Sequence, residues 1–565
     1  MQIAFPTKIL PAALTVVWLL TSAAAGALNF YDDVPAPELA GQIVGAMTDE
    51  EALAQIYMFG WKDWIRGPEP NIEEWITRRS IGGVKVFGWN TGDIEQLART
   101  IGDFQKLAGS GRFSVPLLVA TDQEGGTVRH VKDRTSETPS AMAQGASGFP
   151  EDAYRSGWYV GKELAVLGIN MNFAPMVDLY TNHDSTLIGP RSFGDDPVKT
   201  GLLGIAFAKG QEKSGVISTA KHFPGHGDTA LDSHGTLPRI GVDFETLWER
   251  ELVPYRMLAK DGIPAIMSGH LAFPRTEAGD EPASLSPWFL QTVLREKIGY
   301  TGLIVTDDLA MNGATVRTGT LSQAAKAAVI AGNDLVMLSH TPAPDEPIWT
   351  SLLQEMRVNT DFQARVRDAA RRVLLVKLRF LKGQNAVPLQ PDIGAVRTGL
   401  SDAEGKEFFL DVAARSVTLI GAKEGLIPLD GAKAAGVLLC YPPERNPQKK
   451  LPDFFVAGRR AYPEAPRIWY DHNNLGQLFS FAADADTIIF YLRDREEIAV
   501  LNSLRRFGKR VIVFSGENPS YLQSLSWVDC AIALYNNTYE SHIAAFSALR
   551  GSLKPIGALP FKQDF

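Results

Sequence analysis

Eight short apolar runs in the first two thirds of the chain constrain its fold more than any other feature. Each is long enough for one buried strand, and longer amphipathic stretches with helical spacing lie between them, such as 94–107, 152–167, 202–213, 244–259 and 321–331. The runs are 55–59, 83–87, 116–121, 169–173, 216–219, 265–268, 303–306 and 334–338. This β-α alternation predicts a (β/α)8 barrel, and a doubly wound sheet is the alternative.

A second set of strand-like runs follows a linker. A long amphipathic helix over 362–381 ends near Gly383, and the Pro- and Gly-containing stretch after it is typical of a linker. Strand-like runs then recur over 417–420, 436–440, 487–491, 511–514 and 530–534. We expect a smaller α/β domain with a parallel sheet. The predicted organisation is a signal peptide over 1–27, a barrel over 28–383, a linker over 384–400 and a C-terminal α/β domain over 401–565.

The N-terminus has the pattern of an export signal. Lys8 is the only charged side chain in the first thirty residues, an apolar run over 9–20 follows, and small residues lead to an exit at Ala25 or Ala27. The alternative is an uncleaved membrane anchor, but the run is short for a span of about 20 residues. We therefore expect a periplasmic or secreted protein that is not inserted in a membrane after cleavage.

Composition narrows the possible partners. The net charge of −8 argues against a nucleic-acid-binding surface. Cys440 and Cys530 are the only cysteines in the sequence, and two cysteines do not make a disulfide framework. We expect two buried thiols, and a disulfide bond between them is the alternative.

Polar side chains follow five of the predicted barrel strands. In such a barrel the carboxyl ends of the strands meet at one face, where catalytic residues lie. From the third strand to the seventh, the residues are Asp122 and Glu124, Asp178 and Arg191, Lys221 and His222, His270, and Asp307 and Asp308. Their convergence predicts an active site on that face.

The stretch over 221–234 holds three histidines and two aspartates in fourteen residues. Metal binding is an alternative, because His and Asp are good ligands. The spacing fits no helical His-x-x-x-His pair, and the glycines and proline are typical of an ordered but movable loop. We expect neither a metal nor an organic cofactor.

Four stretches together resemble glycoside hydrolase family 3, in particular its β-N-acetylglucosaminidase branch. They are Lys-His-Phe-Pro-Gly-His-Gly with the later Asp-Ser-His over 221–234, Val-Thr-Asp-Asp-Leu-Ala-Met over 305–311, Asp-Gln-Glu-Gly-Gly over 122–126, and Gly-Pro-Arg-Ser-Phe-Gly over 189–194. The resemblance covers the barrel and extends more weakly to 551–560.

The resemblance implies roles for individual residues. Asp307 matches the nucleophile, His234 the general acid/base, and Asp232 the partner that orients it. The residues that match the sugar-binding set are Asp122, Arg191, Lys221 and His222. The branch usually has an arginine where this chain has His130, and Arg129 beside it is an alternative for that contact.

These residues support a retaining glycosidase, and the resemblance implies a carbohydrate with terminal β-linked GlcNAc as its substrate. Asp307 would form a glycosyl ester, and the His234–Asp232 pair would protonate the leaving group and then activate water. The alternative functions are a phosphorylase that uses phosphate in place of water, a family 3 β-glucosidase and a non-enzymatic glycan-binding protein. If His234 is not the proton donor, the alternative donor is Glu124 or a residue of the second domain. No motif distinguishes peptidoglycan fragments from chitooligosaccharides.

Overall fold

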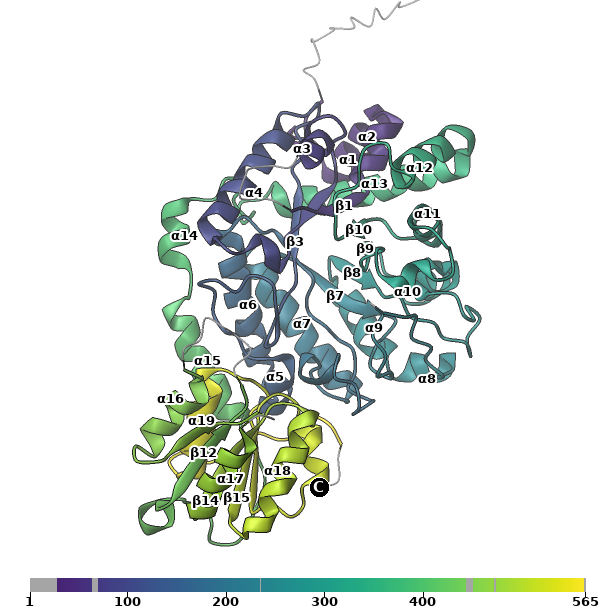
Figure 1. Cartoon of the computed structure of the whole chain (residues 1–565). Coiled ribbons are helices and arrows are strands. Elements are labelled where there is room, and N and C mark those ends of the chain that lie inside the picture. The colour runs from purple at the N-terminus through teal and green to yellow at the C-terminus, as the bar shows by residue number, and fades with distance from the viewer. Residues whose placement is uncertain (1–27, 63–69, 234, 444–450, 472–473, 563–565) are drawn as a thin grey trace, which may run out of the picture.

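The computed structural model describes residues 28–62, 70–233, 235–443, 451–471 and 474–562. These residues form two α/β units joined by helical segments (Figure 1). The predicted signal peptide over 1–27 and His234 lie outside the described residues. No helix among the described residues is long and apolar enough to cross a membrane.

The larger unit is a barrel of eight parallel strands in the order β10-β1-β2-β3-β6-β7-β8-β9. The strands are β1 (Tyr57–Gly60), β2 (Gly83–Lys85), β3 (Leu118–Thr121), β6 (Met171–Asn172), β7 (Ile217–Phe223), β8 (Ala265–Ser268), β9 (Leu303–Thr306) and β10 (Val336–Leu338). A parallel bridge between Val305 and Leu335 joins the two ends of the sheet. The predicted barrel is therefore confirmed, with one strand in each of the eight apolar runs.

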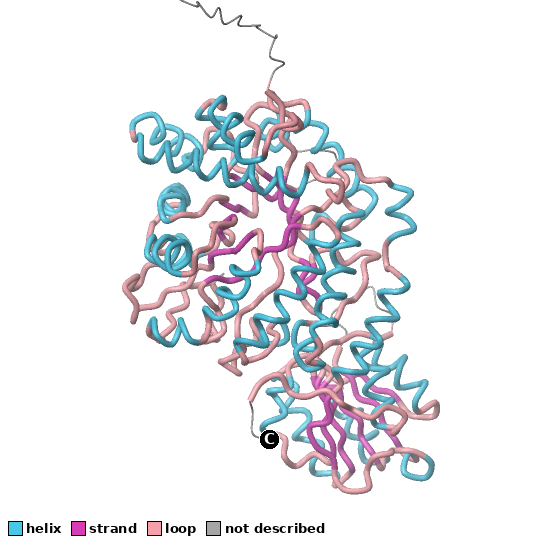
Figure 2. The backbone as a smooth tube through the Cα atoms, turned by 180° about the vertical axis from the view of Figure 1, so that it is seen from behind, coloured by secondary structure: helices cyan, strands magenta, loops and turns pink. Residues whose placement is uncertain are grey.

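Helices surround the strands on the outside (Figure 2). They are α1 (Ala36–Ala46), α2 (Asp49–Gln55), α3 (Pro70–Thr77), α4 (Ile94–Gly109), α5 (Ala141–Ser147), α6 (Pro150–Val166), α7 (Pro197–Lys213), α8 (Phe244–Glu249), α9 (Leu252–Asp261), α10 (Asn312–Thr315), α11 (Leu321–Ala331), α12 (Pro347–Val358) and α13 (Thr360–Leu381). Local sequence sets their ends: Thr48 and Glu51 form a reciprocal capping box at the start of α2.

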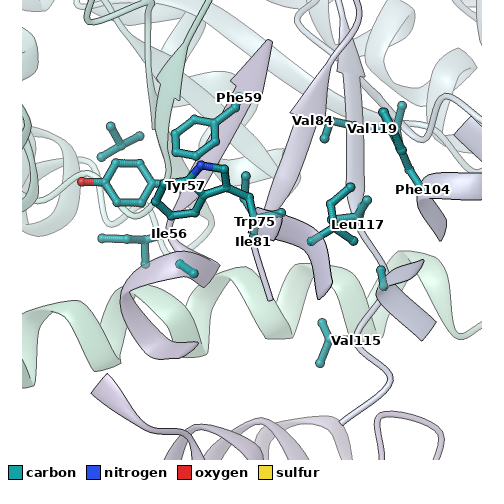
Figure 3. Close-up of a cluster of buried hydrophobic side chains, with 14 of the residues drawn as sticks. Ile56, Tyr57, Phe59, Trp75, Ile81, Val84, Phe104, Val115, Leu117 and Val119 are labelled. Carbon is teal, nitrogen blue, oxygen red and sulfur yellow. The ribbon is translucent and has the colours of Figure 1, made fainter. Parts of the chain in front are cut away.

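The barrel's hydrophobic core is largest between the first strands and the helices around them. Figure 3 shows Tyr57, Phe59 and Trp75 packed together, with Leu117 and Val119 farther along the sheet, at β3, which β2 separates from β1. All five side chains are at most 1% exposed. Burial of this apolar surface stabilises the scaffold that holds the strand ends in place.

The smaller unit has a six-stranded sheet in the order β11-β16-β15-β14-β12-β13. Its strands are β11 (Thr418–Ala422), β12 (Val437–Tyr441), β13 (Arg467–Trp469), β14 (Thr487–Leu492), β15 (Arg510–Ser515) and β16 (Cys530–Ala533). Its helices are α15 (Ala403–Ser416), α16 (Asp453–Ala461), α17 (Leu475–Asp484), α18 (Ile498–Leu504) and α19 (Tyr539–Leu549). Cys440 and Cys530 are buried free thiols.

Four features differ from or add to the sequence-based expectations, and one of them is the three-residue strand β13, which no predicted run covers. The second sheet is mixed, since β11 pairs antiparallel with β16, so the prediction of a parallel sheet was wrong at this edge. A short helix, α14 (Ile393–Gly399), lies inside the predicted linker. A hairpin of β4 (Gln123–Gly125) and β5 (Val128–Arg129) follows β3 and was not predicted.

The second domain packs against the part of the barrel that carries the β6–α7 connection. Tyr180 in that connection bonds through its hydroxyl to Asn518 and Ser520 of the second domain. The C-terminal segment also crosses to the barrel: the Pro560 carbonyl accepts from the Asp195 N–H at 3.1 Å. Figure 1 shows the second domain directly beside α5. The connection that holds Arg191 is therefore enclosed by both domains.

Candidate active site

Asp122 lies at the carboxyl end of β3, the end of the barrel that we refer to as its mouth. Lys85, the last residue of β2, and Lys221, in β7, place their Nζ atoms 2.5 Å from the two Asp122 carboxylate oxygens. Both lysines are 2% exposed. Residues from β2, β7 and the end of β3 thus hold one carboxylate between two buried ammonium groups.

Glu124 continues this arrangement toward the second domain. It receives a bidentate pair of hydrogen bonds from Arg191, both at 2.8 Å, and lies 2.6 Å from Lys221 Nζ. We refer to Lys85, Asp122, Glu124, Arg191 and Lys221 as the mouth network. Its three cations and two carboxylates make an environment that favours an additional anion.

The cations of the mouth network keep its two carboxylates ionised. Burial by itself raises the pKa of the Glu124 carboxyl, but Arg191 and Lys221 outweigh burial and lower it to about 2. The same competition, with Lys221 and Lys85, holds the pKa of Asp122 well below its usual value. Glu124 is therefore ionised near neutral pH, which argues against it as the proton donor that replaces His234.

Asp307 lies at the carboxyl end of β9, on the same face as the mouth network. Burial raises the pKa of its carboxyl, but the nearby His222 and His270 imidazoles and the Asp308 N–H outweigh this effect and lower it. That N–H donates to Asp307 Oδ1 at 2.8 Å. The half-buried Asp307 is thus held as an oriented carboxylate anion, which is the form that a nucleophile requires.

Asp308 has a different role from its neighbour. Its Oδ1 accepts from the Ala310 and Ser339 N–H groups at 3.0 and 3.1 Å, and its carbonyl oxygen lies 3.0 Å from His270 Nε2. Asp308 therefore shapes the loop after β9.

His222 forms a buried pair with Asp178. Its Nδ1 donates to Asp178 Oδ2 at 2.7 Å, and Asp178 also accepts from the His226 backbone N–H at 2.7 Å. Asp178 is 1% exposed. This carboxylate fixes the imidazole orientation and leaves His222 Nε2 as the ring nitrogen that is not bound to Asp178.

The described part of the loop after β7 lies at the mouth. The Ser233 carbonyl accepts from the Gly313 N–H at 3.2 Å, in the helix that follows Asp307 in the chain. Asp232 is exposed. At the base of the loop, Arg250 bonds to Asp228 at 2.7 Å and to Glu251 at 2.6 Å. The loop thus has an anchored base and reaches the connection after β9.

His130 and Arg129 point to different partners. His130 Nδ1 lies 3.7 Å from Asp122 Oδ2. Arg129 donates to the Ser136 carbonyl at 2.7 Å and pairs with Glu137 at 3.6 Å. His130, rather than Arg129, therefore lies beside the mouth network.

The structure thus brings Asp122, Arg191, Lys221, His222 and His130 together with Asp307, and it adds three residues to the predicted set: Lys85, Glu124 and Asp178. Glu124 is predicted from the sequence only as an alternative proton donor. Lys85 lies inside the predicted strand run 83–87. A charged residue in a buried strand is unusual, and this feature of the sequence could have identified Lys85 as a site residue. Asp178 was noted only for its place after the fourth strand. No three His, Cys, Asp or Glu side chains within the described ranges are arranged to hold a metal ion.

A barrel with an ionised carboxylate, a His–Asp pair and a charged hydrogen-bonding network at its mouth has the class of site that carbohydrate-cleaving enzymes use. The model of the glycosyl hydrolase family 3 N-terminal domain matches residues 48–376. The chain belongs to glycosyl hydrolase family 3, and the predicted family and enzyme class are confirmed.

Within this family, the chain is similar to β-hexosaminidases and β-N-acetylglucosaminidases. A β-hexosaminidase from Tolumonas auensis is 37% identical over 284 residues, which cover 49% of this chain and 82% of that protein. The family 3 β-N-acetylglucosaminidase of Paenibacillus sp. FPU-7 has a similar structure, with a TM-score of 0.82 and 29% identity over 92% of this chain and 99% of that chain. A fungal multi-domain family 3 β-N-acetylglucosaminidase gives a TM-score of 0.82 at 28% identity, over 91% of this chain and 61% of that chain.

Proposed function

We propose that this protein is a retaining exo-β-N-acetylglucosaminidase that removes terminal β-linked GlcNAc from peptidoglycan fragments or chitooligosaccharides. The observation that carries the proposal is the ionised Asp307 carboxylate, oriented by the Asp308 N–H, on the same barrel face as the mouth network. The names of the relatives support GlcNAc as the sugar.

In the proposed first step, Asp307 attacks the anomeric carbon while the bond to the leaving oxygen breaks. His234, as imidazolium oriented by Asp232, gives its proton to that oxygen. In the second step, neutral His234 takes a proton from water, the water oxygen bonds to the anomeric carbon, and Asp307 leaves as a carboxylate.

The mouth network would hold the sugar. Asp122 can accept hydrogen bonds from sugar hydroxyls, whereas Lys221 and Arg191 can only donate. His222 and His130 border the same space and would contact the sugar ring or its substituents. Because the network is already bonded internally, it is organised before the substrate binds.

Product analysis tests this function. Purified enzyme is incubated with chitobiose and with a GlcNAc-terminated peptidoglycan disaccharide, with and without inorganic phosphate, and the first-formed sugar is followed by NMR. We expect free β-GlcNAc in both buffers, with retained configuration. GlcNAc 1-phosphate as the main product would establish a phosphorylase. Cleavage of cellobiose in a parallel assay, without cleavage of either GlcNAc substrate, would establish a β-glucosidase.

We further propose that the protein is exported, on the basis of the signal-like N-terminus. Cell fractionation of the source organism, with N-terminal sequencing of the mature protein, tests this. A cytoplasmic protein that retains residues 1–27 would contradict it.

A further inference from the structure

The segment over 557–562, which we refer to as the strap, runs from the second domain onto the barrel. The Ala558 N–H donates to the carbonyl of Ala146, in α5, at 3.0 Å. Farther along, the Pro560 carbonyl accepts from the Asp195 N–H at 3.1 Å. Asp195 lies in the β6–α7 connection, so the strap joins the second domain to the part of the barrel that carries a proposed sugar-binding residue.

The strap approaches the barrel too closely for a side chain at one position. Gly194 has a φ of 142°, and a Cβ atom there would overlap the Pro560 carbonyl oxygen. The Lys562 N–H donates to Asp195 Oδ2 at 2.8 Å. The strap and the residues that follow Arg191 are therefore in direct backbone contact.

Phe561 is the buried aromatic side chain of the strap. It is 4% exposed, and its ring meets the Tyr180 ring edge-on, with the two centroids 5.1 Å apart and an angle of 83°. The His183 ring lies 5.0 Å from the Phe561 ring. The Tyr180 hydroxyl bonds to Asn518 and Ser520 of the second domain. The second domain therefore holds Tyr180 both at its ring and at its hydroxyl.

The contacts of Tyr180 continue to Arg191. Ile188 belongs to the same buried cluster as Phe561 and Tyr180, and it is 0% exposed. Its carbonyl accepts from the Arg191 N–H at 2.8 Å, and the Gly194 carbonyl accepts from the Tyr180 N–H at 2.9 Å. The turn that carries Arg191 thus packs on the cluster that Phe561 completes.

Two different parts of the molecule fix Arg191. Glu124 binds its guanidinium through two bonds of 2.8 Å, whereas the β6–α7 connection sets the position of its backbone. The Arg191 side chain is 12% exposed and lines a cleft of about 1290 Å³ between the barrel mouth and the second domain. The point at which the guanidinium can meet a sugar hydroxyl therefore depends on the connection as well as on Glu124.

We propose that Phe561 is a positioning residue of the sugar site: by packing against Tyr180, it holds the β6–α7 connection where Arg191 can bind the terminal sugar. The inference rests on the proposed function, in which Arg191 contacts that sugar. Phe561 acts through the connection and does not itself touch the substrate. The strap thereby makes the geometry of a barrel site dependent on the second domain.

The expected defect is specific to sugar binding. Replacement of the buried Phe561 ring by a methyl group leaves a cavity, into which the surrounding residues partly collapse. A shift of the connection would weaken the bonds between Arg191 and the sugar in the ground state and in the transition state alike, which raises KM and leaves kcat nearly unchanged. Partial unfolding, by contrast, would lower the apparent kcat and leave KM unchanged.

Steady-state kinetics on a nitrophenyl β-GlcNAc tests the proposal. We expect Phe561→Ala to raise KM about fivefold to twentyfold, with kcat within about threefold of the wild type. The inhibition constant of free GlcNAc, which reports sugar binding alone, should rise in parallel. Phe561→Leu fills most of the space and should recover most of the loss. Ile556→Ala is the matched control, because Ile556 lies just before the strap and is 60% exposed, and it should change KM less than about twofold.

A double-mutant cycle separates an effect through Arg191 from a general one. Arg191→Lys keeps the charge but cannot form the bidentate pair with Glu124. In that background, Phe561→Ala should change kcat/KM by less than about threefold, because the positioned group is already lost. The same fold-loss in both backgrounds would overturn the proposal. So would an unchanged KM and GlcNAc inhibition constant in Phe561→Ala.

Thermal unfolding verifies that each variant is folded at the assay temperature. If Phe561→Ala does not fold, Tyr180→Phe takes its place, since it removes only the hydroxyl bonds to Asn518 and Ser520. We then expect a KM increase of about twofold to fivefold, and an unchanged KM would overturn the proposal. Wild-type enzyme without activity on nitrophenyl β-GlcNAc would instead contradict the proposed function.

Discussion

The two ends of the barrel both hold buried ionic groups, and they differ in their surroundings within the described residues. At the mouth, Asp122 lies between Lys85 and Lys221, next to a large cleft. At the opposite end, Asp334 precedes β10, is 0% exposed, and pairs with Arg295 at 2.6 Å and Arg365 at 2.8 Å. We infer that buried ion pairs of the same type support substrate binding at the mouth and stability at the opposite end.

The two ends of the barrel differ in how a charged group is solvated after its ion-pair partner is removed. A buried charge without a partner cannot recover its hydration at the closed end, whereas water or a substrate can reach groups at the mouth. We therefore expect substitutions at the closed end to reduce stability and those at the mouth to reduce activity. Substitutions at both ends test this contrast.

The largest effect is expected at Asp307. Asp307→Asn keeps the shape of the side chain and removes the negative charge that attacks the anomeric carbon. We expect kcat to fall by at least about 10³-fold, with a thermal unfolding midpoint close to that of the wild type. Asp308→Asn is the control and should lose far less, since its side chain bonds to backbone N–H groups. A residual rate above about a tenth of wild type would exclude Asp307 as nucleophile.

The second effect concerns His234 and depends on the leaving group. His234→Gly should slow cleavage of a natural disaccharide by about 10²- to 10⁴-fold at the glycosylation step, since its alkoxide needs a proton to leave. A nitrophenyl β-GlcNAc should be affected much less, and Asp232→Ala should give a smaller defect of the same kind. Azide should restore part of the rate. Pre-steady-state measurements that find equal losses on both substrates would make His234 a binding residue.

A matched pair of carboxylates compares the two ends directly. Asp334→Asn leaves Arg295 and Arg365 partly unpaired in a closed environment, so we expect a loss of about 3–5 kcal/mol in the free energy of unfolding. Asp122→Asn should cost less stability but should reduce kcat/KM by at least about tenfold. Urea denaturation and kinetics on the same preparations check both. The contrast fails if Asp122→Asn is the more destabilising change.

The smallest effect is a gain in stability at the closed end. Lys377 is 0% exposed, and burial lowers its pKa to about 7; its Nζ lies 3.0 Å from Gln55 Oε1. We expect Lys377→Met to raise the free energy of unfolding at pH 7 by about 1–2 kcal/mol.

The pH dependence has a definite sign. Between pH 7 and the ordinary lysine pKa, the unfolded chain binds the proton and the folded chain does not, so wild-type stability gains a contribution as pH rises. The advantage of Lys377→Met should therefore decrease from pH 7 to pH 10. An advantage that grows with pH would show that Lys377 is protonated in the folded protein.

The sequence predicts the barrel well because each strand lies in a mostly apolar run and is buried along its length. It does not predict β4 and β5, since that hairpin is short and polar, or β13, which has three residues. The antiparallel pairing of β11 depends on long-range contacts that local patterns do not contain.

The candidate site also has a part that the sequence predicts and a part that it does not. Strand ends predict that Asp122, Lys221 and Asp307 share one face, because parallel strands converge there. Pairings such as His222 with Asp178 require the path of a long connection, which periodicity does not specify. The cleft depends on how two domains pack, and no single segment contains that information.

Asp307 is expected to form a covalent bond to GlcNAc during turnover. A nitrophenyl β-GlcNAc makes the first step fast, and His234→Gly should slow the second step, so the intermediate should accumulate. The variant is mixed with this substrate, quenched in acid and digested, and the peptides are analysed by mass spectrometry. The account predicts one GlcNAc residue on the peptide that contains Asp307, and its loss when azide is added before the quench. An adduct on another carboxylate, or products of inverted configuration, would contradict the account.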